Sequence, residues 1–294
     1  MILRKEPGIL RNYFSVRKSL LSSLREDLGT GDITSGTLIG NKFLKSATIL
    51  CKESTPVVIA GLEEVRLIFE ICKCSSTLLV KDGSIVGNGM KVVKINGEAK
   101  NILKAERTAL NYLMRMTGIA TETRRFVDAV NEISRNIKIL STRKTAPGLR
   151  YFDKKAVKIG GGYPHRTSLS DMVLIKDNHI TLTGSVKNSV LNARKSLGNN
   201  VKIECEVTSL NSAIEAIHSG ANIVMLDNFS PTEVKRTILR LETMGLRQKC
   251  LIEVSGGVNM DNISRYAEAK PDMISLGTLT HSVKSADFSL DIRV

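Results

Sequence analysis

The first hundred residues contain two kinds of segment: stretches in which apolar residues recur at helical intervals, and short apolar runs. Apolar residues recur at helical intervals over 11–28 and 63–73, and turn-rich segments separate these stretches from short runs that are typical of strands. The predicted strands are 46–51, 57–60, 77–80 and 91–96. Because helices and strands mix here without a parallel rhythm, the pattern predicts a small α+β domain.

A long helical pattern begins near Glu98. Apolar residues between Ile102 and Met114 recur at helical intervals, and after Gly118 a second helical stretch runs towards Val130. We expect these two helices to link the first domain to a second one.

From Ile137 the pattern becomes strand, loop and helix, repeated. The predicted strands are 137–141, 172–175, 201–205, 223–226, 251–254 and 273–276, with helical spacing in most of the gaps. Buried strands that alternate with helices predict parallel pairing with right-handed crossovers, in a barrel or a doubly wound sheet. Six strands are fewer than the eight of a complete barrel, so an open or incomplete α/β barrel is the preferred architecture.

Polar residues and glycines follow these predicted strands at the point where each one ends. They are Thr142, Arg143, Lys144, Lys176, Asp177, Asn178, His179, Glu206, Asp227, Asn228, Ser255, Gly256, Gly257, Gly277 and Thr278. Because the carboxyl ends of parallel strands share one edge, where barrel active sites lie, we expect these residues to meet in one site.

Charge indicates what this site binds. The stretch 141–179 is rich in Arg and Lys and contains the run Gly160-Gly161-Gly162, within a chain of formal net charge +14. Such charge fits nucleic acid, an anionic membrane or a phosphorylated small substrate. Aromatic residues make up only 4% of the chain, with no Trp, which argues against a base-stacking platform for single strands.

The cysteines and the amino terminus bear on location. Five cysteines, odd in number, are scattered through mostly apolar segments and are expected to be reduced, buried thiols of a cytoplasmic protein rather than zinc ligands. The first ten residues lack the apolar core of a signal peptide, and no apolar run approaches the roughly 20 residues of a membrane span. We therefore expect neither a secreted nor a membrane protein.

Several site residues have two interpretations from the residues alone. Ser255-Gly256-Gly257 and Gly277 follow the last two strands, where barrels bind phosphate, although the first group could also be only a tight turn. Glu206 and Asp227 suit Mg²⁺ carried by a pyrophosphate or a developing cation, or serve as capping carboxylates. Glu204 would share the strand face of Glu206, which leaves open which of these two is the functional carboxylate. Lys176 is either a fixed cation for an anionic ligand or a Schiff-base nucleophile, as in an aldolase.

Motifs along nearly the whole chain resemble quinolinate phosphoribosyltransferase, the carboxylating nicotinate-nucleotide pyrophosphorylase family of NAD biosynthesis. The matching segments, in order, are EDLGTGDITS, ERTALNYLMRMTGIAT, STRKTAPGLR, GGGYPHR, LIKDNH, ECEVTSL, LDNFSP, IEVSGGV and ISLGTLTHS. The resemblance implies an N-terminal α/β sandwich domain over 1–115, an incomplete α/β barrel over 116–278, and a tail over 279–294 that returns to the first domain.

The resemblance also implies roles for the site residues. Those implied to bind the two carboxylates of quinolinate and nearby phosphates are Arg143, Lys144, His165, Arg166 and Lys176, beside Thr142. Glu206 and Asp227 would lie near the ribose and its Mg²⁺, which they would hold indirectly or through the pyrophosphate. Ser255, Gly256, Gly257 and Gly277 would bind the 5′-phosphate of phosphoribosyl pyrophosphate.

Catalysis is assigned by the resemblance to Lys144, Lys176, Glu206 and Asp227. Arg107 would reach the site of a neighbouring subunit, which makes a homodimer the smallest active unit.

The expected reaction joins quinolinate to phosphoribose and releases pyrophosphate and carbon dioxide. Two residues depart from the family pattern: Pro164 stands where Asn is common, and Ser168 where Gly is frequent. They leave open a related enzyme of the same fold that takes a different aromatic acid. A Schiff-base aldolase and a nucleic-acid-binding protein are the remaining hypotheses from other classes.

Overall fold

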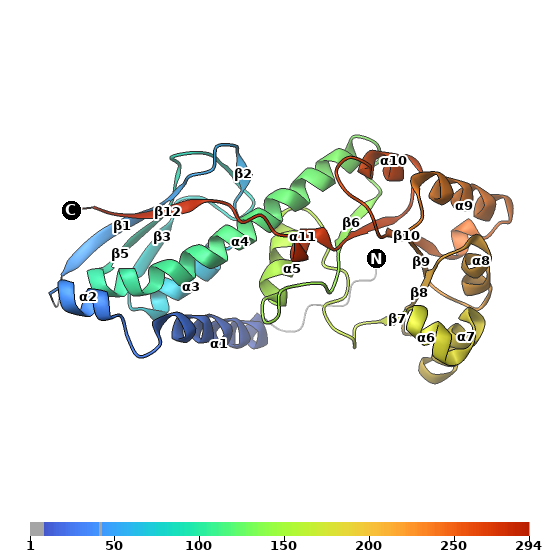
Figure 1. Ribbon diagram of the computed structural model, residues 1–294, viewed down its shortest axis with the longest axis horizontal. Helices are drawn as coiled ribbons and strands as arrows, with labels where there is room; N and C mark the ends of the chain where they lie inside the picture. Colours follow the sequence, from blue (N-terminus) through green and yellow to red (C-terminus); the bar gives the residue numbers. More distant parts are fainter. Residues whose placement is uncertain (1–8, 41–42, 294) are drawn as a thin grey trace. The chain divides into compact units, whose positions relative to one another are not determined.

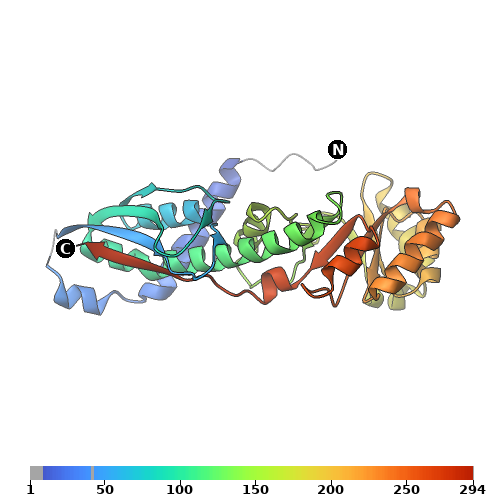
Figure 2. The ribbon, with the colours of Figure 1, turned by 90° about the horizontal axis from the view of Figure 1, so that it is seen from above.

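The chain folds into two compact units, and the computed structural model describes its residues 9–40 and 43–293 (Figures 1 and 2). The first unit takes the described residues of Met1–Thr121 and Val283–Val294, and the second takes Glu122–Ser282. No helix within the described ranges is both long and apolar enough to span a membrane.

An antiparallel sheet of four strands forms the centre of the first unit. Its order is β12 (Phe288–Arg293), β1 (Leu44–Cys51), β5 (Lys91–Glu98) and β3 (Ser75–Leu78). The helices α1 (Ile9–Leu28), α3 (Leu62–Ile71) and the first part of α4 (Ala99–Asn131) lie on one face of this sheet, as Figure 1 shows. The remaining elements are α2 (Ile33–Leu38) and the strand pair β2 (Val57–Val58) and β4 (Ile85–Val86).

This layered arrangement follows from the alternation of side chains along the strands. In β5, the buried Val93 and Ile95 alternate with the exposed Lys94 and Asn96, so one face packs against the helices and the other faces outward. The expected α+β sandwich is confirmed.

Helix α4 differs from the sequence prediction, because one continuous helix replaces the two that were expected on either side of Gly118. A Cβ atom at Gly118 would overlap the carbonyl oxygen of Lys284. The glycine is therefore needed for the close approach of another backbone segment and does not end the helix.

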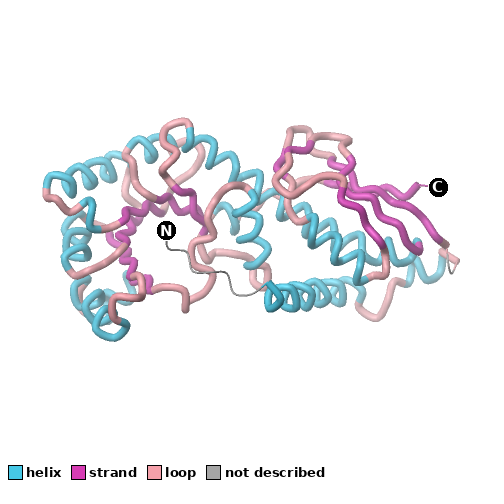
Figure 3. Tube along the Cα trace, turned by 180° about the vertical axis from the view of Figure 1, so that it is seen from behind, coloured by secondary structure: helices cyan, strands magenta, loops and turns pink. Residues whose placement is uncertain are grey.

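Six parallel strands form the sheet of the second unit. Its order is β6 (Lys138–Ser141), β11 (Met273–Leu276), β10 (Leu251–Ser255), β9 (Ile223–Asp227), β8 (Ile203–Val207) and β7 (Val173–Ile175). Figure 3 shows these strands as an open arc with helices along its outer side. The helices are α5 (Arg150–Ile159), α6 (Asp177–Thr183), α7 (Val186–Leu197), α8 (Leu210–His218), α9 (Pro231–Thr243), η1 (Arg247–Lys249), α10 (Ile263–Glu268) and α11 (Thr278–His281).

The arc does not close into a barrel in the described part of the chain, because β6 and β7 occupy opposite ends of the strand order. Beyond β6, Tyr163 alone adds a parallel bridge, to Leu140. The expected open, six-stranded α/β architecture is confirmed. All five cysteines are free and buried, as expected.

Candidate active site

The carboxyl ends of the parallel strands bring most of the predicted site residues to one edge of the sheet. Ser255 at the end of β10 pairs with Asp227 at the end of β9, and Leu276 of β11 pairs with Ser141 of β6. The segments that follow these strands therefore begin side by side at the carboxyl edge of the sheet. Arg107 is the predicted residue that lies elsewhere: it belongs to α4 in the first unit.

Lys176, Glu206 and Asp227 form a charged group at the ends of three neighbouring strands. Lys176 Nζ forms an ion pair with Glu206 Oε2, which favours a fixed cation over a free nucleophilic amine. Burial raises the pKa of Asp227, and the negative charge of Glu206 adds to this effect, while Lys176, Asn228 and Lys144 oppose it. The two carboxylates are thus close enough for the charge of Glu206 to act on Asp227.

Glycines bring the backbone close to this charged group. A Cβ at Gly256, where φ is +88°, would overlap the side chain of Asn228, and a Cβ at Gly277 would lie 3.3 Å from Cδ of Lys144. Asn228 itself has φ +58°, and its N–H donates to Ser255 O at 2.8 Å. Gly257, at φ +66°, has open space on its Cβ side, so a ligand can approach the backbone there.

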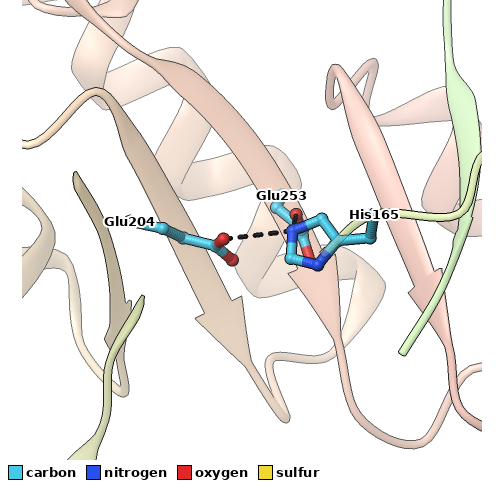
Figure 4. Close-up of side chains that lie close together, drawn as sticks. All are labelled: His165, Glu204 and Glu253. Atoms are coloured by element: carbon cyan, nitrogen blue, oxygen red, sulfur yellow. Dashed lines mark hydrogen bonds and ion pairs between the residues drawn. The ribbon is translucent and has the colours of Figure 1, made fainter. Parts of the chain in front are cut away.

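His165 contacts two glutamates that are buried in the sheet (Figure 4). Its Nε2 lies 3.1 Å from Glu204 Oε2 and 3.6 Å from Glu253 Oε2, and both glutamate side chains are fully buried. Burial lowers the pKa of His165, but the hydrogen bond to Glu204 and the charges of both glutamates outweigh it and raise the pKa overall. His165 is thereby favoured as a cation.

The second glutamate has a strongly perturbed environment. Burial raises the pKa of Glu253, and the negative charge of Glu204 raises it further, against opposing effects of His165, the Ser275 hydroxyl and Lys176. One oxygen of each glutamate, Glu204 Oε1 and Glu253 Oε2, has no hydrogen-bond partner within the described ranges. Burial and the neighbouring Glu204 therefore favour the neutral form of Glu253.

Two clusters of side chains that contain carboxylates are candidates for metal binding. Ligand atoms of His165, Glu204 and Glu253 all lie within 4.8 Å of one another, but this group includes an imidazole nitrogen that already bonds to Glu204. Mg²⁺ prefers oxygen ligands and retains waters. The less buried Glu206 and Asp227 supply only oxygens, so they fit Mg²⁺ better.

Arg143 lies near Arg166, the residue that follows His165 in the chain. Arg166 is buried, and both burial and the positive charge of Arg143 lower its pKa. The buried Nε of Arg143 has no hydrogen-bond partner among the residues that the structure describes. An N–H donor that lacks a partner and lies near a second guanidinium group suits a carboxylate or phosphate ligand. Next to it, Thr142 Oγ1 accepts a hydrogen bond from the Lys144 N–H at 3.1 Å.

The two departures from the family pattern have local structural partners. Ser168 Oγ donates to Asp171 Oδ1 at 2.7 Å, and the Thr167 N–H donates to Asp171 Oδ2 at 2.7 Å. The Pro164 carbonyl accepts from Ser141 Oγ at 3.3 Å and from Lys154 Nζ. Both residues therefore shape the backbone that leads into and out of His165 and Arg166.

Sequence reasoning missed three residues of this site. Glu253 lies within the apolar strand segment LIEV, and its signal was a carboxylate with apolar neighbours. Lys154 is buried, although the sequence around it, with Lys155 and Lys158, is typical of a solvated face. Asp171 carried no distinguishing signal beyond its place before a strand.

Known families and proteins match this chain over nearly its full length. The family described as "Quinolinate phosphoribosyl transferase, C-terminal domain" matches residues 119–291, and the corresponding N-terminal domain matches residues 32–117. A protein of Methanothermobacter thermautotrophicus named "Probable nicotinate-nucleotide pyrophosphorylase [carboxylating]" is 40% identical, over 92% of this chain and 96% of its own. The "Nicotinate-nucleotide pyrophosphorylase [carboxylating]" of Mycobacterium leprae is 35% identical, over 95% and 98% of the two chains.

A solved structure agrees with these matches. The crystal structure of NadC from Streptococcus pyogenes superposes with a TM-score of 0.87 at 36% identity, and the match covers 95% of this chain and 96% of the other. The chain therefore belongs to the quinolinate phosphoribosyltransferase family.

Proposed function

We propose that this protein transfers phosphoribose from phosphoribosyl pyrophosphate to quinolinate, with loss of one carboxylate. The products are nicotinate mononucleotide, pyrophosphate and carbon dioxide. The observation that carries the proposal is that Arg143 lies near Arg166, the residue after His165, with a buried guanidinium nitrogen of Arg143 that lacks a partner within the described ranges. The relatives named as carboxylating nicotinate-nucleotide pyrophosphorylases support it.

Quinolinate binding requires cations for two carboxylates. Arg143 and Arg166 offer planar guanidinium groups that bind a carboxylate through two parallel hydrogen bonds. His165, favoured as a cation by Glu204 and Glu253, adds a third positive group. These residues would fix the pyridine ring with its nitrogen towards the phosphoribosyl group, and orientation of this kind accelerates a reaction between two substrates.

The phosphoribosyl substrate would lie towards the other strand ends. Ser255, Gly256, Gly257 and Gly277 would offer backbone N–H groups to the 5′-phosphate. Lys144 and Lys176 would bind the phosphates and stabilise the negative charge of the leaving pyrophosphate.

Charge development at the ribose explains the acidic residues in this basic site. The pyridine nitrogen attacks the anomeric carbon as pyrophosphate departs, and the sugar becomes oxocarbenium-like. Glu206 and Asp227 favour that positive charge. Bound Mg²⁺ would neutralise pyrophosphate charge, and these two carboxylates are the ones that would hold it, indirectly or through the pyrophosphate. Once alkylated, the positively charged ring stabilises the electron pair that decarboxylation leaves on the ring carbon, and a proton from solvent takes the place of the lost carboxylate. The protein therefore needs only to orient the carboxylate.

We further propose a homodimer in which Arg107 of one subunit completes the site of the other. Arg107 lies on α4 in the first unit, whereas the other proposed substrate-binding residues lie in the second. Mixing Arg107→Ala subunits with subunits that carry Arg166→Ala tests this idea: shared sites restore part of the activity in the mixture, and unshared sites do not.

The reaction is tested with purified protein, Mg²⁺, phosphoribosyl pyrophosphate and quinolinate labelled on the carboxylate that is lost. Stoichiometric release of labelled carbon dioxide and pyrophosphate is expected. Nicotinate, which lacks that carboxylate, serves as the matched control, and we expect weaker stabilisation of the protein by nicotinate than by quinolinate in thermal denaturation. Release of neither product, or equal stabilisation by both acids, would overturn the proposal.

A further inference from the structure

The buried ammonium group of Lys154 lies directly behind the quinolinate side of the site. Lys154 belongs to α5, and only 5% of its surface is exposed. Its Nζ donates to Ser141 Oγ at 3.0 Å, to Ser141 O at 3.4 Å and to the Pro164 carbonyl. Burial of an ammonium group is costly, and all three of these hydrogen-bond acceptors are uncharged oxygens.

These acceptors belong to two segments that meet beside the site. Tyr163 extends the sheet next to β6, since its N–H donates to Ile139 O at 2.8 Å and its carbonyl accepts from the Ser141 N–H at 3.0 Å. The next residue, Pro164, has no N–H and cannot continue this pairing. Lys154 and Ser141 Oγ bond to its carbonyl instead.

The backbone turns sharply just after this anchored carbonyl. His165 has φ +50°, in the left-handed region that residues other than glycine rarely adopt. Such a conformation persists only where the surroundings enforce it. The turn points the imidazole of His165 at Glu204 and is followed at once by the buried Arg166.

We propose that Lys154 is a positioning residue: its ammonium group fixes the Pro164 carbonyl to the end of β6 and thereby holds His165 and Arg166 in place for the carboxylates of the substrate. This inference rests on the proposed function. It assigns to Lys154 a role in the affinity for quinolinate without contact with quinolinate.

Protonation of Lys154 makes this role sensitive to pH. Burial and, to a smaller extent, the charges of Arg150 and Arg143 lower the pKa of Lys154 to about 8, against the opposing charges of Asp153 and Asp171. His165 is also affected, because the charge of Lys154 lowers the pKa of the imidazole. A neutral amine has two N–H donors for three acceptors, so the anchor loosens as the pH rises through about 8.

Substitution of Lys154 tests the proposal through the kinetics of the full-length enzyme. Lys154→Met keeps the length of the side chain and removes the charge and the donors. We expect its KM for quinolinate to rise roughly tenfold or more, because one charge-assisted hydrogen bond contributes this much, with the KM for phosphoribosyl pyrophosphate nearly unchanged. Lys158→Met, at an exposed position of the same helix, is the matched control and should change neither constant.

Lys154→Arg separates positioning from general stability and remains informative if the Met variant does not fold. Arginine stays charged at every accessible pH, so this variant should retain most of the affinity for quinolinate. It should also lack the decline in kcat/KM near pH 8 that we expect for the wild type. An equal rise of both KM values in the Met variant, or an unchanged decline in the Arg variant, would overturn the proposal.

A measurement without turnover distinguishes failure of this proposal from failure of the proposed function. The imidazole resonances of His165, assigned with a His165→Gln variant among the four histidines of the chain, should shift in Lys154→Met and remain in Lys158→Met. A wild type that does not convert quinolinate overturns the function. An active wild type in which Lys154→Met changes neither the resonances nor the KM overturns the positioning role.

Discussion

The candidate site can be divided into two halves, which lie at the edge of the same sheet but differ in the residues that pack against them. The buried half consists of Arg143, His165 and Arg166. Behind it, the fully buried Glu204 and Glu253 and the buried Lys154 contact these groups or the backbone next to them. The open half consists of Lys144, Lys176, Glu206 and Asp227, where charged side chains meet one another at the strand ends.

Glu204 and Glu206 illustrate the difference within one strand. They are two residues apart in β8 and share a face of the sheet. Glu204 is fully buried against His165, whereas Glu206 is partly exposed and pairs with Lys176. The buried half is thus part of the core, so we expect its residues to affect stability and function together, and residues of the open half to affect mainly function.

Substitution of these two glutamates gives the largest expected effect. Glu204→Ala removes the fully buried hydrogen-bonding partner of the mostly buried His165 and should lower the free energy of unfolding by roughly 3–5 kcal/mol. Glu206→Ala should lower it by less than about 1 kcal/mol, because its partner Lys176 is 44% exposed and an ion pair that solvent reaches contributes little, while turnover falls. Denaturant titration of both variants measures the difference, and equal losses of stability would contradict the division into two halves.

A smaller effect is expected from substitutions that separate the two substrates. Arg166→Ala should weaken quinolinate binding by roughly 1.5–3 kcal/mol, the range for a hydrogen bond to a charged group. Lys144→Ala should instead raise mainly the KM for phosphoribosyl pyrophosphate. Steady-state kinetics with each substrate varied in turn measures both constants. If both variants impaired the two substrates alike, the assignment of one substrate to each half would be wrong.

The same division explains what the sequence could predict. Residues of the open half can be predicted because they directly follow apolar strands in the sequence. Lys176, Glu206 and Asp227 were predicted in this way, and the structure adds the ion pair between Lys176 and Glu206 and the effect of both on Asp227. The strand pattern also predicted the open six-stranded sheet, because buried parallel strands have continuous apolar runs.

Arg143, His165 and Arg166 were predicted, but the groups that support them could not be, because their contacts join distant segments of the chain. Glu253 and His165 are 88 positions apart and meet only through the strand order. Lys154 resembles its neighbours Lys155 and Lys158 in sequence, and only the packing of α5 distinguishes it. The same holds for Gly118, whose close contact with the carbonyl of Lys284 keeps α4 continuous where a helix end was expected.

Substitution of two adjacent glycines beside the open half should have a smaller effect. Gly256 and Gly257 both have positive φ, but only at Gly256 would a Cβ overlap Asn228. Gly256→Ala should cost about 1–3 kcal/mol of stability and raise the KM for phosphoribosyl pyrophosphate. Gly257→Ala should cost about 1 kcal/mol, from backbone strain alone. Thermal denaturation and kinetics compare them, and an equal cost would show that contact with Asn228 is unimportant.

The smallest expected effect concerns Asp171, which lies at the edge of the buried half. Burial opposes ionisation of Asp171, but hydrogen bonds from Thr167 and Ser168 outweigh it and lower its pKa from 3.8 to about 2. Since the pKa is lower in the folded state, the stabilisation is fully present above pH 3.8 and is lost as the pH falls towards 2. The residue is largely exposed, so Asp171→Asn should cost less than about 1 kcal/mol at neutral pH.

The dependence of this small cost on pH identifies its origin. Denaturant titrations of wild type and Asp171→Asn between pH 3 and 6 should give a difference that is constant above about pH 5 and shrinks below it. A difference that stays constant down to pH 3 would mean that Asp171 acts through its shape and not its charge. Ser168→Gly, which restores the residue frequent in the family and removes one donor to Asp171, should reduce the same difference. Ser168 would then stabilise the loop after Arg166 through the charge of Asp171.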